Sequence, residues 1–150
     1  DIENGVLRNN KPSAAPWAQP PFKEGDPKYA FCIECDPRIH FALNCAANSC
    51  PPISVYDVED EGKFNKQLDL ATKGFLGQKA NVLIDKEKKS VDLSMLMTWY
   101  ASVFGDSEPG VLEWVAQNAD DDTKSELQSI LTGESPSLKY LAYDWGVNSS

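Results

Sequence analysis

The only histidine of the chain and two of its four cysteines lie in one short stretch, where His40 is followed by Cys45 and Cys50. A thiolate is a nucleophile, and a neighbouring imidazole lowers the pKa of the thiol and carries its proton. His40 with Cys45 or Cys50 is therefore a candidate pair for a thiol-dependent hydrolase or transferase. The competing interpretation is a buried, hydrogen-bonded histidine beside two packed cysteines. We favour it because His40 and Cys45 are five positions apart across the end of an expected strand.

The other two cysteines, Cys32 and Cys35, form a C-x-x-C motif. A redox pair would need Cys32 at a helix N-terminus, and the Asp-Pro pair that follows Cys35 disfavours a continuing helix. All four cysteines together, Cys32, Cys35, Cys45 and Cys50, offer four thiolate ligands for a structural zinc ion. The interpretation that we favour is packing or a local disulfide, so we expect no cofactor and keep zinc as the alternative.

Two further patterns have a chemical and a structural interpretation. A disulfide between Cys45 and Cys50 would close a short loop and stabilise the fold by about 2–3 kcal/mol at most. Five aromatic side chains could line a pocket, but their spacing is more typical of a core. These five are Trp99, Tyr100, Trp114, Tyr143 and Trp145.

Length and charge limit the classes of function. The chain has 150 residues, which fits a single domain over 1–150, and a formal net charge of −9 with a pI near 4.5. Neutralising phosphates requires a surplus of Lys and Arg, so the charge argues against nucleic acids and anionic membranes as partners. No apolar run approaches the roughly 18 residues that a spanning helix needs. The chain begins at Asp1 rather than Met, so we expect a processed product or a piece of a longer protein, and its localisation stays unknown.

The elements that must position the cysteines follow from periodicity. Residues 39–43 are apolar except for His40 and predict a short buried strand, and residues 44–50 predict a tight loop. After the acidic cluster 59–61, apolar residues recur at helical spacing and predict one buried stripe, with Gly77 as the stop. The members of this stripe are Phe64, Leu68, Ala71 and Phe75.

The second half of the chain alternates strand and helix signals. Residues 81–84 and 90–93 predict a hairpin, and 138–145 predict a terminal strand. Three helices are expected between them. The first runs from the cap Ser94 to Gly105, the second spans 110–119, and the third starts at a capping box of Thr123 with Glu126 and stops at Gly133. The predicted fold class is α+β, with several helices packed on a small antiparallel sheet.

The stretch Asp36–Pro52, which reads D-P-R-I-H-F-A-L-N-C-x3-S-C-P, resembles the signature of the domain of unknown function 547 family. Other segments resemble further motifs of this family, and together they extend over almost the whole chain. These are D-I-E-N-G-V-L-R at 1–8, I-x-V-Y at 53–56, Q-L-D at 67–69, F-L at 75–76, L-S at 93–94, W-Y at 99–100 and Y-L-A-Y-D-W at 140–145.

This chain differs from the family pattern in two ways. The family domain normally begins with helices that contain an Asn-Ala-Tyr-Asn motif, upstream of the segment that corresponds to residues 1–8, so this chain resembles its C-terminal part. Cys32 and Cys35 lie outside the family pattern. No activity is established for the family as a whole, and a family likeness does not by itself give a function.

We expect from this a non-catalytic interaction module that docks on a larger assembly or on an N-terminal part of its own domain, with a protein as partner. An incomplete domain should leave an apolar surface for such a partner. The alternative is the thiol-dependent hydrolase or transferase that uses His40 with Cys45 or Cys50. A weaker alternative is a zinc or redox domain built on the four cysteines.

Overall fold

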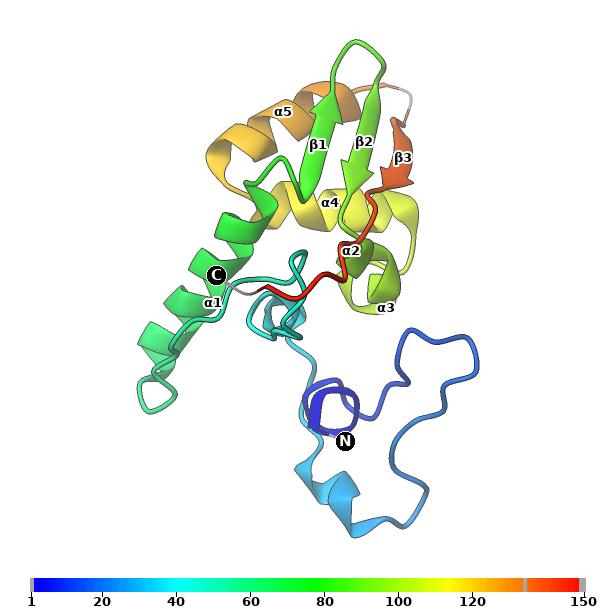
Figure 1. The fold of residues 1–150 in the computed structure, drawn as a ribbon, viewed down its shortest axis with the longest axis vertical. Helices are drawn as coiled ribbons and strands as arrows, with labels where there is room; N and C mark the ends of the chain where they lie inside the picture. Colours follow the sequence, from blue (N-terminus) through cyan, green and yellow to red (C-terminus); the bar gives the residue numbers. More distant parts are fainter. Residues whose placement is uncertain (1, 134, 149–150) are drawn as a thin grey trace.

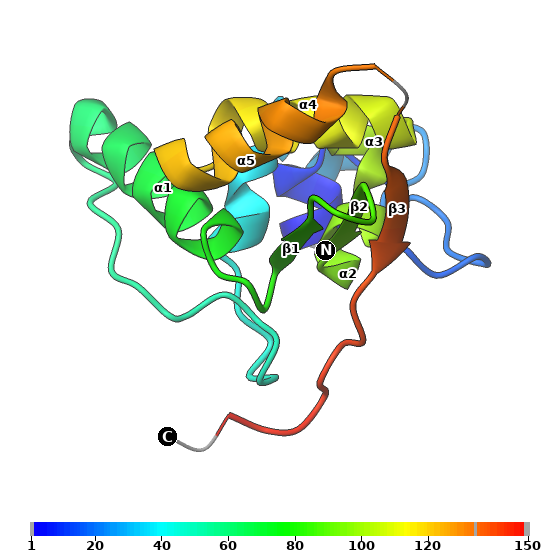
Figure 2. The ribbon, with the colours of Figure 1, turned by 90° about the horizontal axis from the view of Figure 1, so that it is seen from above.

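The computed structural model describes residues 2–133 and 135–148. A three-stranded sheet in the order β1-β2-β3 lies at one end, with helices α4 and α5 behind it (Figure 1). Seen from above, α4 and α5 lie together on one side of the strands (Figure 2). The strands are β1 (Val82–Asp85), β2 (Ser90–Leu93) and β3 (Ser137–Tyr140), and the long helices are α1 (Glu61–Leu76), α4 (Glu108–Asn118) and α5 (Asp121–Leu131).

The fold is α+β, as predicted, but the sheet is mixed and not antiparallel. Strands β1 and β2 form the predicted antiparallel hairpin, whereas β3 pairs with β2 in parallel, with Val91 opposite Leu138. Parallel neighbours require a crossover connection. Helices α2 (Met95–Trp99), α3 (Ala101–Phe104), α4 and α5 form this connection, because they return the chain to the starting end of β2 before β3 begins.

One apolar core joins the sheet to the helices. Helix α1 is capped at its N-terminus by Asp60, whose side chain accepts a hydrogen bond from the backbone of Lys63, and at its C-terminus by Gly77, the predicted stop. Its buried stripe, which includes Leu68 and Phe75, faces the core. The other core residues come from the strands and the remaining helices, among them Val91, Leu93, Met97, Phe104, Val111, Val115, Leu127 and Ile130. Among the described residues, no helix is long and apolar enough to span a membrane.

Several predicted boundaries differ from the structure. The helix expected from Ser94 to Gly105 is divided in two at Tyr100. The last helix is confirmed, but its cap is Asp120 and not the predicted Thr123, since the carboxylate of Asp120 accepts a hydrogen bond of 2.8 Å from the Thr123 backbone. The terminal strand ends at Tyr140, and the rest of the segment predicted as strand pairs elsewhere.

The prediction of a strand over residues 39–43 is wrong. Residues Pro37–Phe41 form a 3₁₀-helix, here called η3. Asp36 caps this helix by accepting a hydrogen bond of 2.9 Å from the backbone of Arg38, and Pro37 occupies the first helical position, where its fixed φ fits and its missing N–H costs nothing. The Asp-Pro pair therefore starts a helical turn, and a short apolar run alone does not distinguish a strand from a buried helix.

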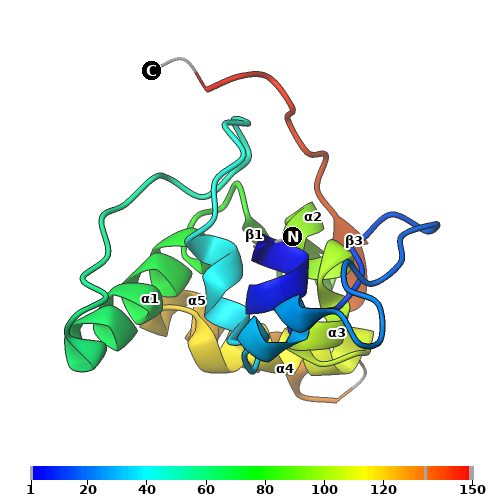
Figure 3. The same cartoon turned by 90° about the horizontal axis from the view of Figure 1, so that it is seen from below.

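The N-terminal part of the chain lies on one side of the helical body, where it is coloured blue (Figures 1 and 3). It contains a π-helical segment, η1 (Ile2–Leu7), and a 3₁₀-helix, η2 (Pro27–Phe31). The long loop between them is held by Asn10, whose side-chain amide exchanges two hydrogen bonds with the backbone of Phe22. The Phe22 ring packs on Gly5 so closely that a Cβ there would lie 2.3 Å from the ring. This packing fixes η1 next to the site described below.

Candidate functional site

A pocket of about 850 Å³ opens between four parts of the chain. These are the N-terminal loop around residues 13–17, the stretch 40–51 that includes the end of η3, helix α2 with Tyr100, and the C-terminal segment (residues 141–148). All three candidate residues of the sequence analysis, His40, Cys45 and Cys50, line this pocket. Tryptophan and tyrosine side chains form a large part of its wall, and Glu3 is the charged side chain among the lining residues. The aromatic members of the wall are Trp17, Trp99, Tyr100, Tyr143 and Trp145.

The two cysteines are brought together by a tight loop. The side chain of Asn44 closes the loop by accepting from the Ala46 backbone and donating to the Pro51 carbonyl, both at 2.6 Å. Ala46 adopts a left-handed conformation with φ of 65°, which turns the chain back. As a result the sulfurs of Cys45 and Cys50 lie 2.6 Å apart, and the backbone N–H of Cys45 donates to the Cys50 sulfur at 3.0 Å. None of the four cysteines, all within the described residues, is in a disulfide.

The C-terminal segment docks on this loop. The backbone of Asn48 donates to the Gly146 carbonyl at 2.8 Å, and the backbone of Ser49 donates to the Asp144 carbonyl at 3.3 Å. In return the Asp144 backbone donates to the Ser49 hydroxyl at 2.9 Å. Figures 2 and 3 show this segment, in red, passing beside the loop. The pairing replaces the long terminal strand that the sequence predicted.

Docking of the C-terminal segment places the Tyr143 hydroxyl next to both thiols. Its oxygen lies 3.2 Å from the Cys50 sulfur and 3.6 Å from the Cys45 sulfur. Burial and the adjacent thiols raise the pKa of Tyr143 well above its usual value, so the phenol keeps its proton and can donate it in a hydrogen bond. Burial acts to raise the pKa of Cys45, but hydrogen bonds from Cys50 and Tyr143 outweigh it, and the net pKa of Cys45 is lowered.

His40 lies in the same wall but is not joined to a thiol. Its ring is 3 % exposed and stacks on Tyr100 with the centroids 3.9 Å apart. Burial, with a further contribution from the charge of Arg8, lowers the pKa of His40 to about 3, so the ring is neutral at neutral pH. Its Nε2 is buried without a hydrogen-bond partner among the described residues. The thiols of Cys45 and Cys50 contact each other and the Tyr143 hydroxyl. In the described part of the chain, no hydrogen bond joins His40 to either thiol, although all three side chains line the same pocket.

The N-terminal part of the chain fixes the other side of His40. The Tyr100 hydroxyl donates to the Glu3 carboxylate at 2.8 Å, and burial together with this carboxylate raises the pKa of Tyr100. The guanidinium of Arg8, which is almost fully buried, lies 4.7 Å above the Tyr100 ring. Arg8 and Glu3 thereby hold Tyr100 against His40, an arrangement that no spacing in the sequence indicated.

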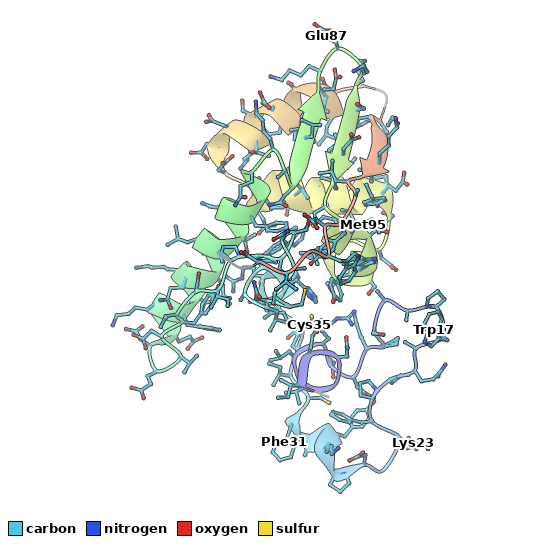
Figure 4. All side chains as sticks on the ribbon, viewed as in Figure 1. Trp17, Lys23, Phe31, Cys35, Glu87 and Met95 are labelled. Atoms are coloured by element: carbon cyan, nitrogen blue, oxygen red, sulfur yellow. The ribbon has the colours of Figure 1, made fainter. Side chains whose placement is uncertain are left out.

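Cys32 and Cys35 lie outside the pocket. The Cys32 thiol donates to the Gly5 carbonyl at 3.3 Å, and burial raises the pKa of Cys35. Cys35 is placed between the N-terminal part and the helical body (Figure 4). Within residues 2–133 and 135–148, no group of three or more His, Cys, Asp or Glu side chains is arranged to hold a metal ion. The four cysteines are therefore not gathered into the zinc-binding set that the sequence analysis kept as an alternative.

The aromatic residues divide between core and pocket. Trp114 packs in the core, 4.7 Å from Phe104 between ring centroids, as expected. Trp99, Tyr143 and Trp145 instead form a cluster with centroid distances of 4.6–5.5 Å, and Trp145 is 66 % exposed. The expectation of a core position is therefore wrong for Trp145, which belongs to the pocket wall.

The site and fold place the chain in a class of small α+β domains with a paired-thiol pocket. A sequence model of the family described as "Protein of unknown function, DUF547" matches residues 1–76, and the chain belongs to this family. The matched part includes His40, Cys45 and Cys50 but ends before Tyr143. Comparison with curated proteins and comparison with solved structures each found no match.

Proposed function

We propose that the domain is a thiol-dependent enzyme in which Cys45 reacts as the nucleophile with a small, largely apolar substrate held in the aromatic pocket. The observation that carries this proposal is the placement of the exposed Cys45 sulfur in the pocket, in contact with the Cys50 thiol and the Tyr143 hydroxyl. These donors favour the thiolate, which is the reactive form. A pocket of this size with a few convergent polar groups is typical of a small-molecule site.

His40 has a different role here from the one predicted. A ring with a pKa of about 3 is too weak a base to take the proton of a thiol at neutral pH. We assign to His40 a place in the pocket wall, where its neutral ring stacks on Tyr100 and supports the aromatic lining. Tyr143 holds the thiolate, and the aromatic wall binds the apolar part of the substrate.

The test measures the rate of alkylation of each cysteine by iodoacetamide as a function of pH, with peptide mapping. Cys45 should react faster than Cys32 in the same molecule at pH 7. In Tyr143→Phe, loss of one hydrogen bond of roughly 1 kcal/mol should raise the midpoint of the Cys45 profile and slow its reaction about fivefold at pH 7. The Cys32 rate, which involves no contact with Tyr143, should not change. Equal rates at Cys45 and Cys32, with no effect of the substitution, would exclude the proposal.

A second candidate, protein binding, is favoured by a strip of exposed apolar side chains along one edge. Val55 is 90 % exposed, and its neighbours in the strip, Ile53, Val58 and Leu70, are also largely exposed. A groove of about 380 Å³ separates residues 52–56 from α1. Such a strip is typical of an interaction surface and agrees with the docking module expected from the sequence.

Self-association tests this second candidate without a known partner. If the strip binds a second copy of the chain, sedimentation velocity should show a dimer that grows with concentration and disappears in Val55→Glu. The matched control is Leu83→Glu, which places the same charge on an exposed apolar position of β1, outside the strip. A chain that stays monomeric at high concentration, or a dimer that survives Val55→Glu, would exclude the strip as a self-association surface.

A further inference from the structure

The pocket contains a second thiol that a simple nucleophilic enzyme would not need. Cys50 lies deeper than Cys45, with its sulfur in contact with the Cys45 sulfur at 2.6 Å. Two donors point at the Cys50 sulfur, namely the Cys45 backbone N–H at 3.0 Å and the Tyr143 hydroxyl at 3.2 Å. These two donors can stabilise the negative charge that develops on this sulfur when it attacks.

We propose that the pocket carries out thiol–disulfide exchange with a small disulfide, in which Cys45 attacks the substrate and Cys50 resolves the mixed disulfide. This inference rests on the proposed function, because it takes Cys45 as the nucleophile and names the class of its substrate. It adds a second reacting residue, Cys50, and a reaction that uses both thiols.

The reaction balances without a further reactant. The Cys45 thiolate attacks one sulfur of the substrate R–S–S–R, forms a bond to it and releases the first R–S⁻, which takes up a proton. Cys50 then gives its proton to solvent, and its thiolate attacks the Cys45 sulfur and forms the Cys45–Cys50 disulfide. The mixed disulfide bond breaks, and the second R–S⁻ leaves and takes up a proton. The substrate is reduced to two thiols and the cysteine pair is oxidised by two electrons. Renewed turnover would need an external dithiol as reductant.

Both steps fit the geometry of the loop. The exposed Cys45 meets the substrate first, and the contact with Cys50 makes the second attack intramolecular, which raises its effective concentration. The loop is held at Asn44 and by its pairing with the C-terminal segment, so the two sulfurs stay together while the mixed disulfide exists. Tyr143 reaches both sulfurs and can follow the negative charge from one to the other.

The lining of the pocket indicates which disulfides fit. Trp99 and Trp145, which pack against each other, both line the pocket and give it an apolar surface. The carboxylate of Glu3 lies in the same wall, and the net charge of the chain is −9, so anionic disulfides are disfavoured. The structure therefore favours a neutral aromatic or apolar disulfide.

The probe for the test is 4,4′-dithiodipyridine, a neutral aromatic disulfide whose released thiopyridone absorbs light. The protein is the full chain with Cys32→Ser and Cys35→Ser, whose fold is checked by circular dichroism against the natural chain. We expect two thiopyridones per chain, the first at a rate that rises with probe concentration and the second at a rate that does not. The product should carry no adduct and should have lost two hydrogens by intact mass. Peptide mapping of the natural chain should locate the same Cys45–Cys50 bond.

The matched variants separate this inference from the proposed function. Cys50→Ser should release one thiopyridone and keep the adduct on Cys45, whereas Cys45→Ser should react slowly. A lasting adduct on Cys45 in the chain that retains both cysteines would overturn the resolving role of Cys50 and leave Cys45 as the nucleophile. A first step no faster than in Cys45→Ser would overturn both proposals. The dianionic 5,5′-dithiobis(2-nitrobenzoate) should react more slowly than the neutral probe, after each rate is divided by its rate with glutathione.

Discussion

Burial of His40 should make the domain lose stability as the pH falls from 7 to 5. The ring is 3 % exposed, and burial lowers its pKa to about 3 in the folded protein. The unfolded chain holds the same ring in water, with a pKa near 6.5. The groups that face His40 do not offset this, since Arg8 contributes in the same direction and Glu3 is engaged by the Tyr100 hydroxyl.

The sign and size of the effect follow from proton linkage. Above about pH 6.5 both states hold a neutral ring, so His40 has no pH-dependent effect on the free energy of unfolding. Below that pH the unfolded chain binds a proton that the folded protein does not, and stability falls by about 1.4 kcal/mol per pH unit until the pH approaches 3. At pH 5 the loss assigned to His40 is therefore about 2 kcal/mol.

The assay is urea unfolding of the natural chain and of His40→Gln at several pH values between 7 and 5. Gln keeps polar atoms at this position but does not titrate, so carboxylates that titrate in both proteins cancel in the comparison. The natural chain should lose about 2 kcal/mol more than the variant over this range, whatever the difference between them at pH 7. Parallel pH dependences would refute the reasoning, because they would mean that His40 keeps its ordinary pKa in the folded protein.

Four further substitutions test local contacts of the fold by urea unfolding at pH 7. Arg38→Met removes a half-buried guanidinium that bonds two aspartates at 2.6 Å, and it should lower the free energy of unfolding by about 2–3 kcal/mol. The control Lys88→Met breaks an exposed ion pair and should cause no measurable loss. Equal losses in the two variants would contradict the argument. Gly105→Ala should cost about 2 kcal/mol or more, because Gly105 has φ of 154° and its Cβ would lie 2.4 Å from the Gly110 backbone. Gly74→Ala, with open space in α1, should gain about 0.5–1 kcal/mol, and a loss there would show that the open space is not available.

Periodicity predicted the parts of the fold that bury one continuous face. The apolar stripe and the stop at Gly77 are properties of a single segment, and the structure confirms the stop and the burial of Leu68 and Phe75, whereas Phe64 is only partly buried. The same holds for the β1–β2 hairpin. The direction of β3 could not be predicted in this way, because it depends on the path of four intervening helices and not on the residues of the strand.

In residues 36–41, helix capping determined the structure, and the apolar pattern gave a wrong prediction. The Asp36-Pro37 pair satisfies the first turn of η3 and overrides the strand-like run that follows it. As a result, a helical turn and not a strand carries His40. The ring stacks on Tyr100 of the short helix pair and sits beside the thiols without bonding to them.

The site itself is completed by residues from both ends of the described chain, and this limits what sequence spacing can reveal. Cys45 and Cys50 define the loop locally, but Tyr143 reaches them only because residues 144–146 pair with that loop. Glu3 reaches Tyr100 only because Phe22 packs on Gly5 and holds η1 in place. The cysteine pair provides the reactive atoms, and hydrogen bonds from Cys50 and from the Tyr143 hydroxyl lower the pKa of Cys45. Tyr143 belongs to a segment that is held by a few hydrogen bonds at an exposed edge. Thiol reactivity in this domain should therefore report docking of the C-terminal segment before it reports unfolding of the core.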